Sequence, residues 1–438
     1  MNRELAKRVV DCLRLTGDPP EVDRLRQYSE GDWRRTLVWL DHAGLALHLL
    51  RRLQSLKATD VLPASIFRRF EDNLAQNRRR LDDMVDQFAT INERFNRAGV
   101  NFAVVKGFSL IPEFCPDASL RTPSDLDYLI DKQSLPSARR VLEEAGYCQQ
   151  RVTDIEVKFR RRSSRIPTRS DDPYSIETEP LVELHLGFWN QKSTGIVLAE
   201  PEFRLDQTVT HEWQGLRFPI LRKEDAFILQ IMHVFQHVLE GWVKLCWLLE
   251  IGYFITAQSL DETFWDRVDI RLHEVPLLAE FAALVTGLAG TVFGATKPPR
   301  TECWAQQLSP AARFWSELYG RTWAMEDHPV HSSGLFASTK LCIFLQWEFM
   351  PDRLVQREMT RRRLFPWKSP ENAVPHDNQT TAGFLRATRL QSLFVIQRLI
   401  FHLGADIRFL WELRRWRELN RRARVIPFGA THGSVERG

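Results

Sequence analysis

Two aspartates separated by one residue have the clearest chemical potential in this sequence of 438 residues. Asp125 and Asp127 open an apolar run that continues to Ile130, which is typical of a buried β-strand. Side chains alternate along a strand, so both carboxylates face the same way, with Cα atoms roughly 6–7 Å apart. Adjacent carboxylates repel unless a cation lies between them, and a hard divalent ion such as Mg²⁺ takes oxygen ligands. The pair therefore predicts a metal site, although an isolated Asp-x-Asp is also typical of a solvated strand edge.

A third acid occurs in a later stretch of alternating character. Leu181-Val-Glu183-Leu-His185 places Glu183 and His185 on one face of a predicted strand over 181–186. If this strand lies beside the Asp-x-Asp strand, three carboxylates converge. Such a cluster suits two-metal phosphoryl or nucleotidyl transfer, with metals about 3.5–4 Å apart.

The order of these motifs resembles the polymerase-beta-like nucleotidyltransferase superfamily, and more closely its uncharacterised nucleotidyltransferase family. The resemblance runs from about residue 30 to the helices near residue 410. The matching motifs are Val104-Val-Lys106-Gly107, Pro116, Leu120-Arg121, Ser124-Asp125-Leu-Asp127-Tyr-Leu-Ile130, Val182-Glu183-Leu-His185 and His233-x3-His237-x9-Trp247-Leu-Leu-Glu250. Two features depart from the family pattern: Phe108 separates Gly107 from Ser109, and the third acid is Glu rather than Asp.

The resemblance implies an α+β fold with a small mixed β-sheet nucleotidyltransferase core, flanked by a helical N-terminal region and a large helical C-terminal domain. It also implies metal-dependent transfer of a nucleoside monophosphate, with AMP from ATP as the default, to a hydroxyl or similar acceptor on a small molecule, peptide or protein. Asp125, Asp127 and Glu183 would be the catalytic and metal-binding residues, with Mg²⁺ or Mn²⁺ as the ion. The alternative is a catalytically inactive module of the same fold that binds a nucleotide or a partner.

The residues around Gly107 are expected to bind the nucleotide phosphates. Gly107 lets the backbone approach a phosphate closely, Ser109 offers a hydroxyl, and a predicted helix at about 108–114 would add amide donors. Lys106 and Arg121 are cations near the phosphates or the acids. Arg121 has an equally plausible structural role in a salt bridge that steers Asp125.

A polar stripe occurs later in the chain, on a helix that packs beside the catalytic sheet in the resembled family. His233, His237, Glu240 and Lys244 recur at steps of four, three and four in two helices predicted over 225–239 and 242–255. Lys244 is a candidate phosphate contact. His-x-x-x-His can bind zinc, but the sequence supplies no convincing third ligand, so a cleft-facing or hydrogen-bonded stripe is favoured.

Composition excludes several classes of protein. The chain is 44% apolar and 26% charged, which is typical of a globular protein of two or three domains. Its net charge of +4 is small, so a nucleic-acid partner is not expected despite local arginine clusters. The six cysteines form no C-x-x-C pair, and no transmembrane segment or signal peptide is apparent. These features together predict a cytoplasmic protein with reduced thiols.

Periodicity and breaks predict the organisation of the chain. Apolar residues at helical steps indicate helices between Leu37 and Leu53 and from Ile66 to Phe95. Further strands are predicted over 102–105, 126–130 and 155–159, and a helix over 135–145. The predicted segments are a helical region over 1–95, the core over 96–222 with a charged flap over 151–180, helices over 223–424 and a tail over 425–438.

Overall fold

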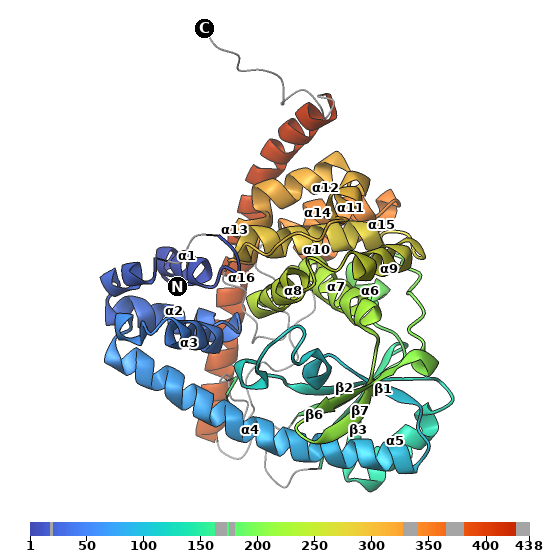
Figure 1. Cartoon of the computed structure of the whole chain (residues 1–438). Helices are drawn as coiled ribbons and strands as arrows, with labels where there is room; N and C mark the ends of the chain where they lie inside the picture. The colour runs from blue at the N-terminus through green and yellow to red at the C-terminus, as the bar shows by residue number, and fades with distance from the viewer. Residues whose placement is uncertain (18–20, 163–172, 175–179, 327–339, 365–380, 426–438) are drawn as a thin grey trace. The chain divides into compact units, whose positions relative to one another are not determined.

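The computed structural model describes residues 1–17, 21–162, 173–174, 180–326, 340–364 and 381–425 (Figure 1). It confirms the predicted α+β fold, with a seven-stranded mixed sheet and many helices. The tail after Val425 and most charged residues of the predicted flap lie outside the described residues. The described contacts divide into two compact units: 1–191 with 197–236 and 243–304, and 192–196 with 237–242 and 305–438. The segment boundaries at residues 95 and 222, which were drawn from the sequence, remain predictions.

Helices form the first part of unit one. The Ser29 side chain accepts a hydrogen bond from the Asp32 amide and so caps the N-terminus of α2 (Glu30–His42). The helical pattern from Leu37 to Leu53 is divided into two helices at Gly44, whose φ of +70° suits a left-handed stop. The helix predicted from Ile66 is confirmed and runs to Arg97. The elements are α1 (Arg3–Cys12), η1 (Val22–Gln27), α2 (Glu30–His42), α3 (Ala46–Ser55), η2 (Thr59–Val61) and α4 (Ala64–Arg97).

The sheet has the strand order β3-β4-β5-β2-β1-β7-β6. Strands β2 and β5 pair in parallel, as do β1 and β7, and the other neighbours are antiparallel. The sequence patterns predicted β1, β2, β4 and β5 but not the remaining strands. The strands are β1 (Phe102–Val105), β2 (Asp125–Ile130), β3 (Tyr147–Val152), β4 (Glu156–Arg161), β5 (Leu181–His185), β6 (Val209–Trp213) and β7 (Leu216–Ile220).

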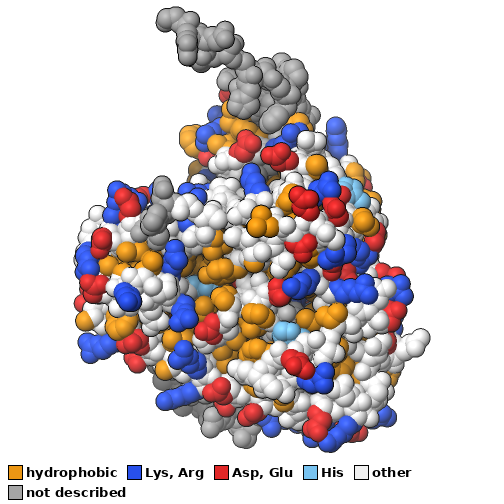
Figure 2. All heavy atoms as spheres, viewed as in Figure 1, with side chains coloured by type: hydrophobic (Ala, Val, Ile, Leu, Met, Phe, Trp, Pro, Cys, Tyr) orange, Lys and Arg blue, Asp and Glu red, His pale blue; other side chains and the backbone are white. Residues whose placement is uncertain are grey.

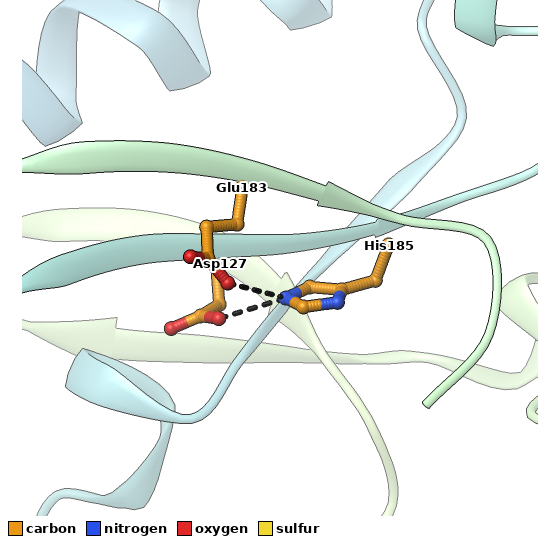
Figure 3. A group of neighbouring side chains, drawn as sticks. All are labelled: Asp127, Glu183 and His185. Carbon is orange, nitrogen blue, oxygen red and sulfur yellow. Dashed lines mark hydrogen bonds and ion pairs between the residues drawn. The ribbon is translucent and has the colours of Figure 1, made fainter. Parts of the chain in front are cut away.

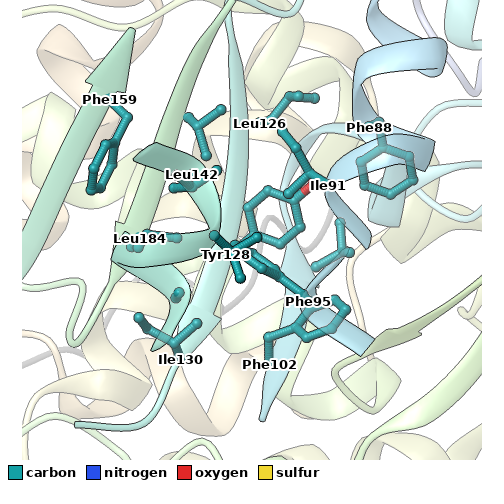
Figure 4. Close-up of a cluster of buried hydrophobic side chains, with 14 of the residues drawn as sticks. Phe88, Ile91, Phe95, Phe102, Leu126, Tyr128, Ile130, Leu142, Phe159 and Leu184 are labelled. Atoms are coloured by element: carbon teal, nitrogen blue, oxygen red, sulfur yellow. The ribbon is translucent and has the colours of Figure 1, made fainter. Parts of the chain in front are cut away.

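One face of the sheet forms the main apolar core (Figure 4). Phe88 and Phe95 of α4 pack there with Tyr128 of β2 and Leu184 of β5, together with Leu142 of α5 (Leu135–Glu144). The ring centroids of Phe95 and Tyr128 lie 5.3 Å apart in an edge-to-face arrangement. Since side chains alternate along each strand, the polar residues between these core positions must point to the opposite face.

The segment after β1 differs from its prediction. In place of a helix over about 108–114, the chain forms one 3-10 turn, η3 (Gly107–Leu110), followed by further turns. Pro112 has no amide hydrogen to donate to a helical ladder, so a helix is unfavourable here. The helix dipole expected behind the phosphate turn is therefore missing from this part of the chain.

The rest of unit one is largely helical from α7 (Lys223–Glu240) onward. The two helices predicted over 225–239 and 242–255 are confirmed as α7 and α8. No helix among the described residues is both long and apolar enough to cross a membrane. The remaining elements that begin before residue 305 are η4 (Ala118–Leu120), α6 (Gln191–Thr194), η5 (Leu205–Gln207), α7 (Lys223–Glu240), α8 (Leu245–Ala257), α9 (Glu262–His273), α10 (Leu278–Phe293) and α11 (Thr301–Gln307). Most of α6 and the ends of α7 and α11 belong to unit two.

Unit two is built mainly from the C-terminal helices. In its described part, Phe344 stacks on Phe409 with ring centroids 5.1 Å apart and on Trp416 at 5.0 Å. Its elements are α12 (Pro310–Trp315), the π-helical turn η6 (Ser316–Gly320), α13 (Arg321–Ala324), α14 (Cys342–Phe349), α15 (Arg353–Leu364) and α16 (Thr381–Val425). Acidic and basic side chains are interspersed on the face of the molecule shown in Figure 2, as the small net charge leads one to expect.

Candidate active site

A row of four residues crosses the sheet at the site. The strand register places Asp127 of β2 beside Val105 of β1 on one side and opposite Glu183 of β5 on the other. Glu183 in turn lies opposite Lys158 of β4. Because the register fixes these pairs, three charged side chains of three different strands lie on the face opposite the main core.

Asp127, Glu183 and His185 converge on this face (Figure 3). The Nε2 atom of His185 lies 2.8 Å from Oδ1 of Asp127 and 3.6 Å from Oε2 of Glu183. One ligand atom of each residue lies within 4.8 Å of the others, and all three residues are buried. The sequence placed His185 on the same face as Glu183, and the structure adds that its ring contacts both acids.

Two lysines balance the buried negative charge. The Lys106 ammonium lies 3.0 Å from Oδ1 of Asp127, and that of Lys158 lies 2.5 Å from Oε1 of Glu183. Burial by itself would lower the pKa of both lysines, but the nearby carboxylates outweigh this effect and raise each pKa above its usual value. Lys158 was missed by the sequence analysis, although the alternation of Glu156-Val-Lys158-Phe places it on the polar face of β4.

The two aspartates of the motif have opposite electrostatic environments. Burial, with the nearby Glu183 and Asp127 carboxylates, raises the pKa of Asp125 to about 7. Burial also acts to raise the pKa of Asp127, but the Lys106 ammonium and the hydrogen bond with His185 lower it well below its usual range. Asp125 accepts a hydrogen bond of 3.0 Å from the Ser124 hydroxyl. The converging group is therefore Asp127, Glu183 and His185. Asp125 is not part of this group, but it lies two residues before Asp127 on the same face of β2.

A pocket opens on the side of the two aspartates. It holds about 720 Å³ of empty space, its open mouth included. All of its lining residues belong to unit one. They are Gly44, Lys106, Gly107, Leu120, Arg121, Thr122, Pro123, Ser124, Asp125, Asp127, Gln230, His233, Lys244, Cys246, Trp247 and Glu250.

Arg121 anchors the Gly107 turn to helix α8. Its Nη1 donates to the Gly107 carbonyl at 2.6 Å, while Nε and Nη2 donate to the two carboxylate oxygens of Glu250 at 2.7 and 3.3 Å. Of the two roles considered for Arg121, the salt bridge with Asp125 is wrong, because the carboxylate partner is Glu250, a residue 129 positions later. A bidentate, buried pair of this kind holds both the turn and the arginine in place.

Ser109 is engaged within its own turn. Its hydroxyl donates to the Lys106 carbonyl at 2.7 Å, and its amide donates to the same oxygen at 2.9 Å. It lines a small neighbouring cavity rather than the pocket beside the aspartates. For Ser109 to contact a phosphate, its hydroxyl must leave the Lys106 carbonyl.

The predicted stripe of four polar residues does not form one continuous face. Helix α7 ends at Glu240, and Lys244 precedes the first turn of α8. His233 and Lys244 line the pocket in unit one. His237 lies in unit two, where its Nδ1 is 3.1 Å from Oε2 of Glu240.

Helix α4 braces the loop that precedes β2. The Asn77 amide donates to the carbonyls of Ser119 and Arg121 at 2.8 and 2.7 Å, and Arg80 donates to the Pro123 carbonyl. The sequence analysis did not identify Asn77 or Arg80. Polar residues on the buried side of an otherwise apolar helical stripe were the available sign of this role.

Comparison with known proteins places the chain in a family. The family model described as "Uncharacterised nucleotidyltransferase" matches residues 29–294, more than half of the chain. No curated protein and no solved structure shows a significant match. The matched segment contains the whole acidic group and every residue that lines the pocket. This chain therefore belongs to the uncharacterised nucleotidyltransferase family.

Proposed function

We propose that this protein uses a divalent metal to transfer a nucleoside monophosphate, AMP from ATP, to a hydroxyl or similar acceptor on a small molecule, peptide or protein. The observation that carries the proposal is the pairing of Asp127 with Glu183 across β2 and β5, at the edge of an open pocket. Transfer of a nucleotidyl group is the activity expected of the family. The metal, the identity of the nucleotide base and the acceptor are the parts that we propose.

The acidic group fits a hard divalent cation. Asp127 and Glu183 are 6% and 5% exposed, so their charges are costly without a cation beside them. Lys106 and Lys158 supply that positive charge in this structure, and an ion would take over their role. Mg²⁺ or Mn²⁺ matches the carboxylate oxygens of the group. When bound, such an ion would neutralise the negative charge that develops on the phosphates during transfer.

Different residues of the chain would bind the nucleotide and activate the acceptor. Asp125 and Asp127 face the pocket and would hold the metal-bound triphosphate, whereas Glu183 does not line it. Lys106, Lys244 and the backbone at Gly107 line the same pocket and would contact the phosphates. Arg121 would hold the Gly107 turn in position, and Ser109 would contribute a hydroxyl after release from Lys106. Glu183 would orient and deprotonate the acceptor hydroxyl, directly or as a metal ligand.

A competing function is nucleotide or partner binding without transfer. The observation that favours it is the neutralisation of the acids by Lys106 and Lys158, which stabilises the site without a metal. A binding module has no requirement for Glu183 as a base. The two functions therefore differ in what they predict for the Glu183 variant.

The test compares the wild type with Glu183→Gln. Each is incubated with ATP labelled in its α-phosphate, Mg²⁺ or Mn²⁺ and an extract of the native cell, and label transfer and pyrophosphate are followed. We expect Glu183→Gln to bind ATP normally but to lose transfer by roughly a hundredfold or more, since nucleophile activation is removed. Glu156→Gln is the control, because Glu156 is also near Lys158, at 3.5 Å, but does not lie opposite Asp127. No transfer by the wild type, with ATP still bound, would favour the binding module.

A further inference from the structure

The pocket beside the aspartates has a chemically mixed lining. Charged side chains of Asp125, Asp127 and Lys106 line it, and so does the ring of Trp247 near the start of α8. The charged residues fit a metal-bound triphosphate, as proposed above. A triphosphate alone has no use for an aromatic ring, so the presence of Trp247 requires a separate explanation.

A series of contacts connects the lining residues Lys106, Gln230, His233 and Trp247. Lys106 lies 3.0 Å from Asp127, and Lys106 and Gln230 line both this pocket and the adjoining small cavity. His233 follows Gln230 by about one turn on α7. The ring of His233 meets that of Trp247 edge-on, with centroids 4.7 Å apart. Trp247 therefore lines the same pocket as the two aspartates and is joined to the Lys106 side by contacts through His233 and Gln230.

Gln230 has a donor that the described protein leaves unused. The residue is only 6% exposed, and its Nε2 atom is buried without a hydrogen-bond partner in the described residues. Buried amide groups are nearly always paired, so an unpaired one in the wall of a pocket is a candidate donor to a ligand that occupies the pocket. The natural partner is an acceptor such as a ring nitrogen or a hydroxyl oxygen.

Trp247 offers a partly exposed ring in the same pocket. The ammonium of Lys244 lies 5.6 Å from its ring centroid, at the outer limit of a cation–π contact. Gly44 closes the wall on this side, since an added Cβ would lie 2.5 Å from the Cys246 sulfur. Stacking of a base on an aromatic side chain changes affinity by about 5- to 150-fold and tolerates any base.

We propose that Trp247 and Gln230 form the nucleoside subsite of this pocket, which binds the base of a purine nucleoside triphosphate. The inference rests on the proposed function, because it takes the triphosphate to lie at Asp125 and Asp127. The indole stacks on the base, and the Gln230 amide donates to an acceptor atom of the nucleoside. A two-ring purine overlaps the two-ring indole more fully than a pyrimidine does, so the subsite favours ATP or GTP over CTP.

The test uses calorimetry with three ligands, each with Mg²⁺: ATP, CTP and inorganic tripolyphosphate. We expect the wild type to bind ATP more tightly than CTP, and CTP more tightly than tripolyphosphate. Trp247→Ala should weaken ATP binding by roughly tenfold or more and leave tripolyphosphate unchanged, while Trp247→Phe should retain most of the affinity. Gln230→Leu should weaken ATP but not tripolyphosphate. Trp411→Ala is the control, because Trp411 is 70% exposed on α16 and lines no part of this pocket.

The outcomes separate this inference from the proposed function. If ATP and tripolyphosphate bind equally and Trp247→Ala changes neither, the nucleoside subsite is wrong while the triphosphate site stands. Equal weakening of both ligands by Trp247→Ala would also overturn it, since the ring would then act only on the shape of the pocket. If the wild type binds none of the three, both the proposed function and the subsite fail.

Discussion

Asp127 of β2 and Glu183 of β5 lie directly opposite each other on adjacent parallel strands. The two carboxylates are buried, and each has an ammonium group within 3.0 Å, from Lys106 and Lys158 respectively. The sheet therefore holds the acids in a fixed relation before any ligand binds. Pre-organisation of this kind lowers the cost of assembling a metal site.

The two aspartates are expected to affect stability in opposite directions. The Asp125 carboxyl has a pKa raised to about 7, so the folded protein keeps a proton that the unfolded chain loses above about pH 4. Stability is therefore lost as pH rises from about 4 to 7. Asp125→Asn should raise the Tm at pH 8 by roughly 2 °C or more. The lowered pKa of Asp127 means that its charge stabilises the fold above about pH 4, so Asp127→Asn should lower the Tm.

Thermal unfolding in a chelating buffer measures both effects, and calorimetry with Mg·ATP measures binding. Each aspartate variant, and the pair combined, should lose Mg²⁺-dependent ATP binding. Asp86→Asn, which removes an exposed carboxylate from α4, is the charge-matched control. Unchanged Mg·ATP affinity in the double variant would contradict the metal site.

The Arg121–Glu250 pair is expected to be important for both stability and binding. The two side chains are 13% and 4% exposed, so Glu250→Gln leaves a buried guanidinium without its counter-charge. We expect a loss of about 3 kcal/mol in the free energy of unfolding. Since Arg121 also holds the Gly107 carbonyl, nucleotide affinity should fall as well. Urea unfolding followed by tryptophan fluorescence measures the loss.

The control for this pair is Glu93→Gln, which breaks the exposed pair of Glu93 with Arg97 on α4. Exposed helical pairs contribute only about 0.5 kcal/mol. Arg121→Lys should also be less stable than the wild type, because an ammonium cannot bond to the two Glu250 oxygens and the Gly107 carbonyl together. A Glu250→Gln protein as stable as Glu93→Gln would show that the buried pair adds little.

His48 is expected to make stability dependent on pH. Its ring is 2% exposed, and burial, followed by the nearby Arg121 charge, lowers its pKa to about 4. As pH falls from about 6.5 to about 4, the unfolded chain takes up a proton that the folded protein refuses, so stability is lost over that interval. The loss is about 3 kcal/mol. His48→Leu should remove it, whereas His273→Gln, at a more exposed histidine, should not.

Thermal unfolding at pH 7 and pH 4.5 provides the comparison for His48. The fall in Tm between the two conditions should be smaller for His48→Leu than for the wild type or His273→Gln. If all three proteins lose the same amount, the acid sensitivity of the fold arises elsewhere.

We expect no zinc at His233 and His237. His233 packs against Trp247, and His237 pairs with Glu240, so the two rings have different surroundings. Within the described ranges, the group of potential metal ligands that converges is Asp127, Glu183 and His185. Elemental analysis of the purified protein should therefore find no stoichiometric zinc that depends on His233 or His237. One zinc per chain that is lost in His233→Ala would contradict this, whereas zinc lost only in His185→Ala would place it at the acidic group.

The sequence by itself determined which residues share a face and where the central strands lie. Alternation in Asp125-Leu-Asp127 and in Glu183-Leu-His185 follows from the geometry of a single strand, which local sequence is enough to specify. The apolar runs fixed β1, β2 and β5 for the same reason. The family resemblance rested on these local motifs, and the matched family bears it out.

Only the tertiary structure decided which of these residues meet. Lys158 reaches Glu183 because β4 pairs with β5, and Arg121 reaches Glu250 across 129 residues of chain. Gln230 enters the pocket because α7 lies along it. Such contacts depend on the pairing of strands and on the packing of helices far apart in sequence, and no local period encodes them. Charge partners in particular follow from burial, since a buried charge must be compensated by whichever opposite charge the fold brings within reach.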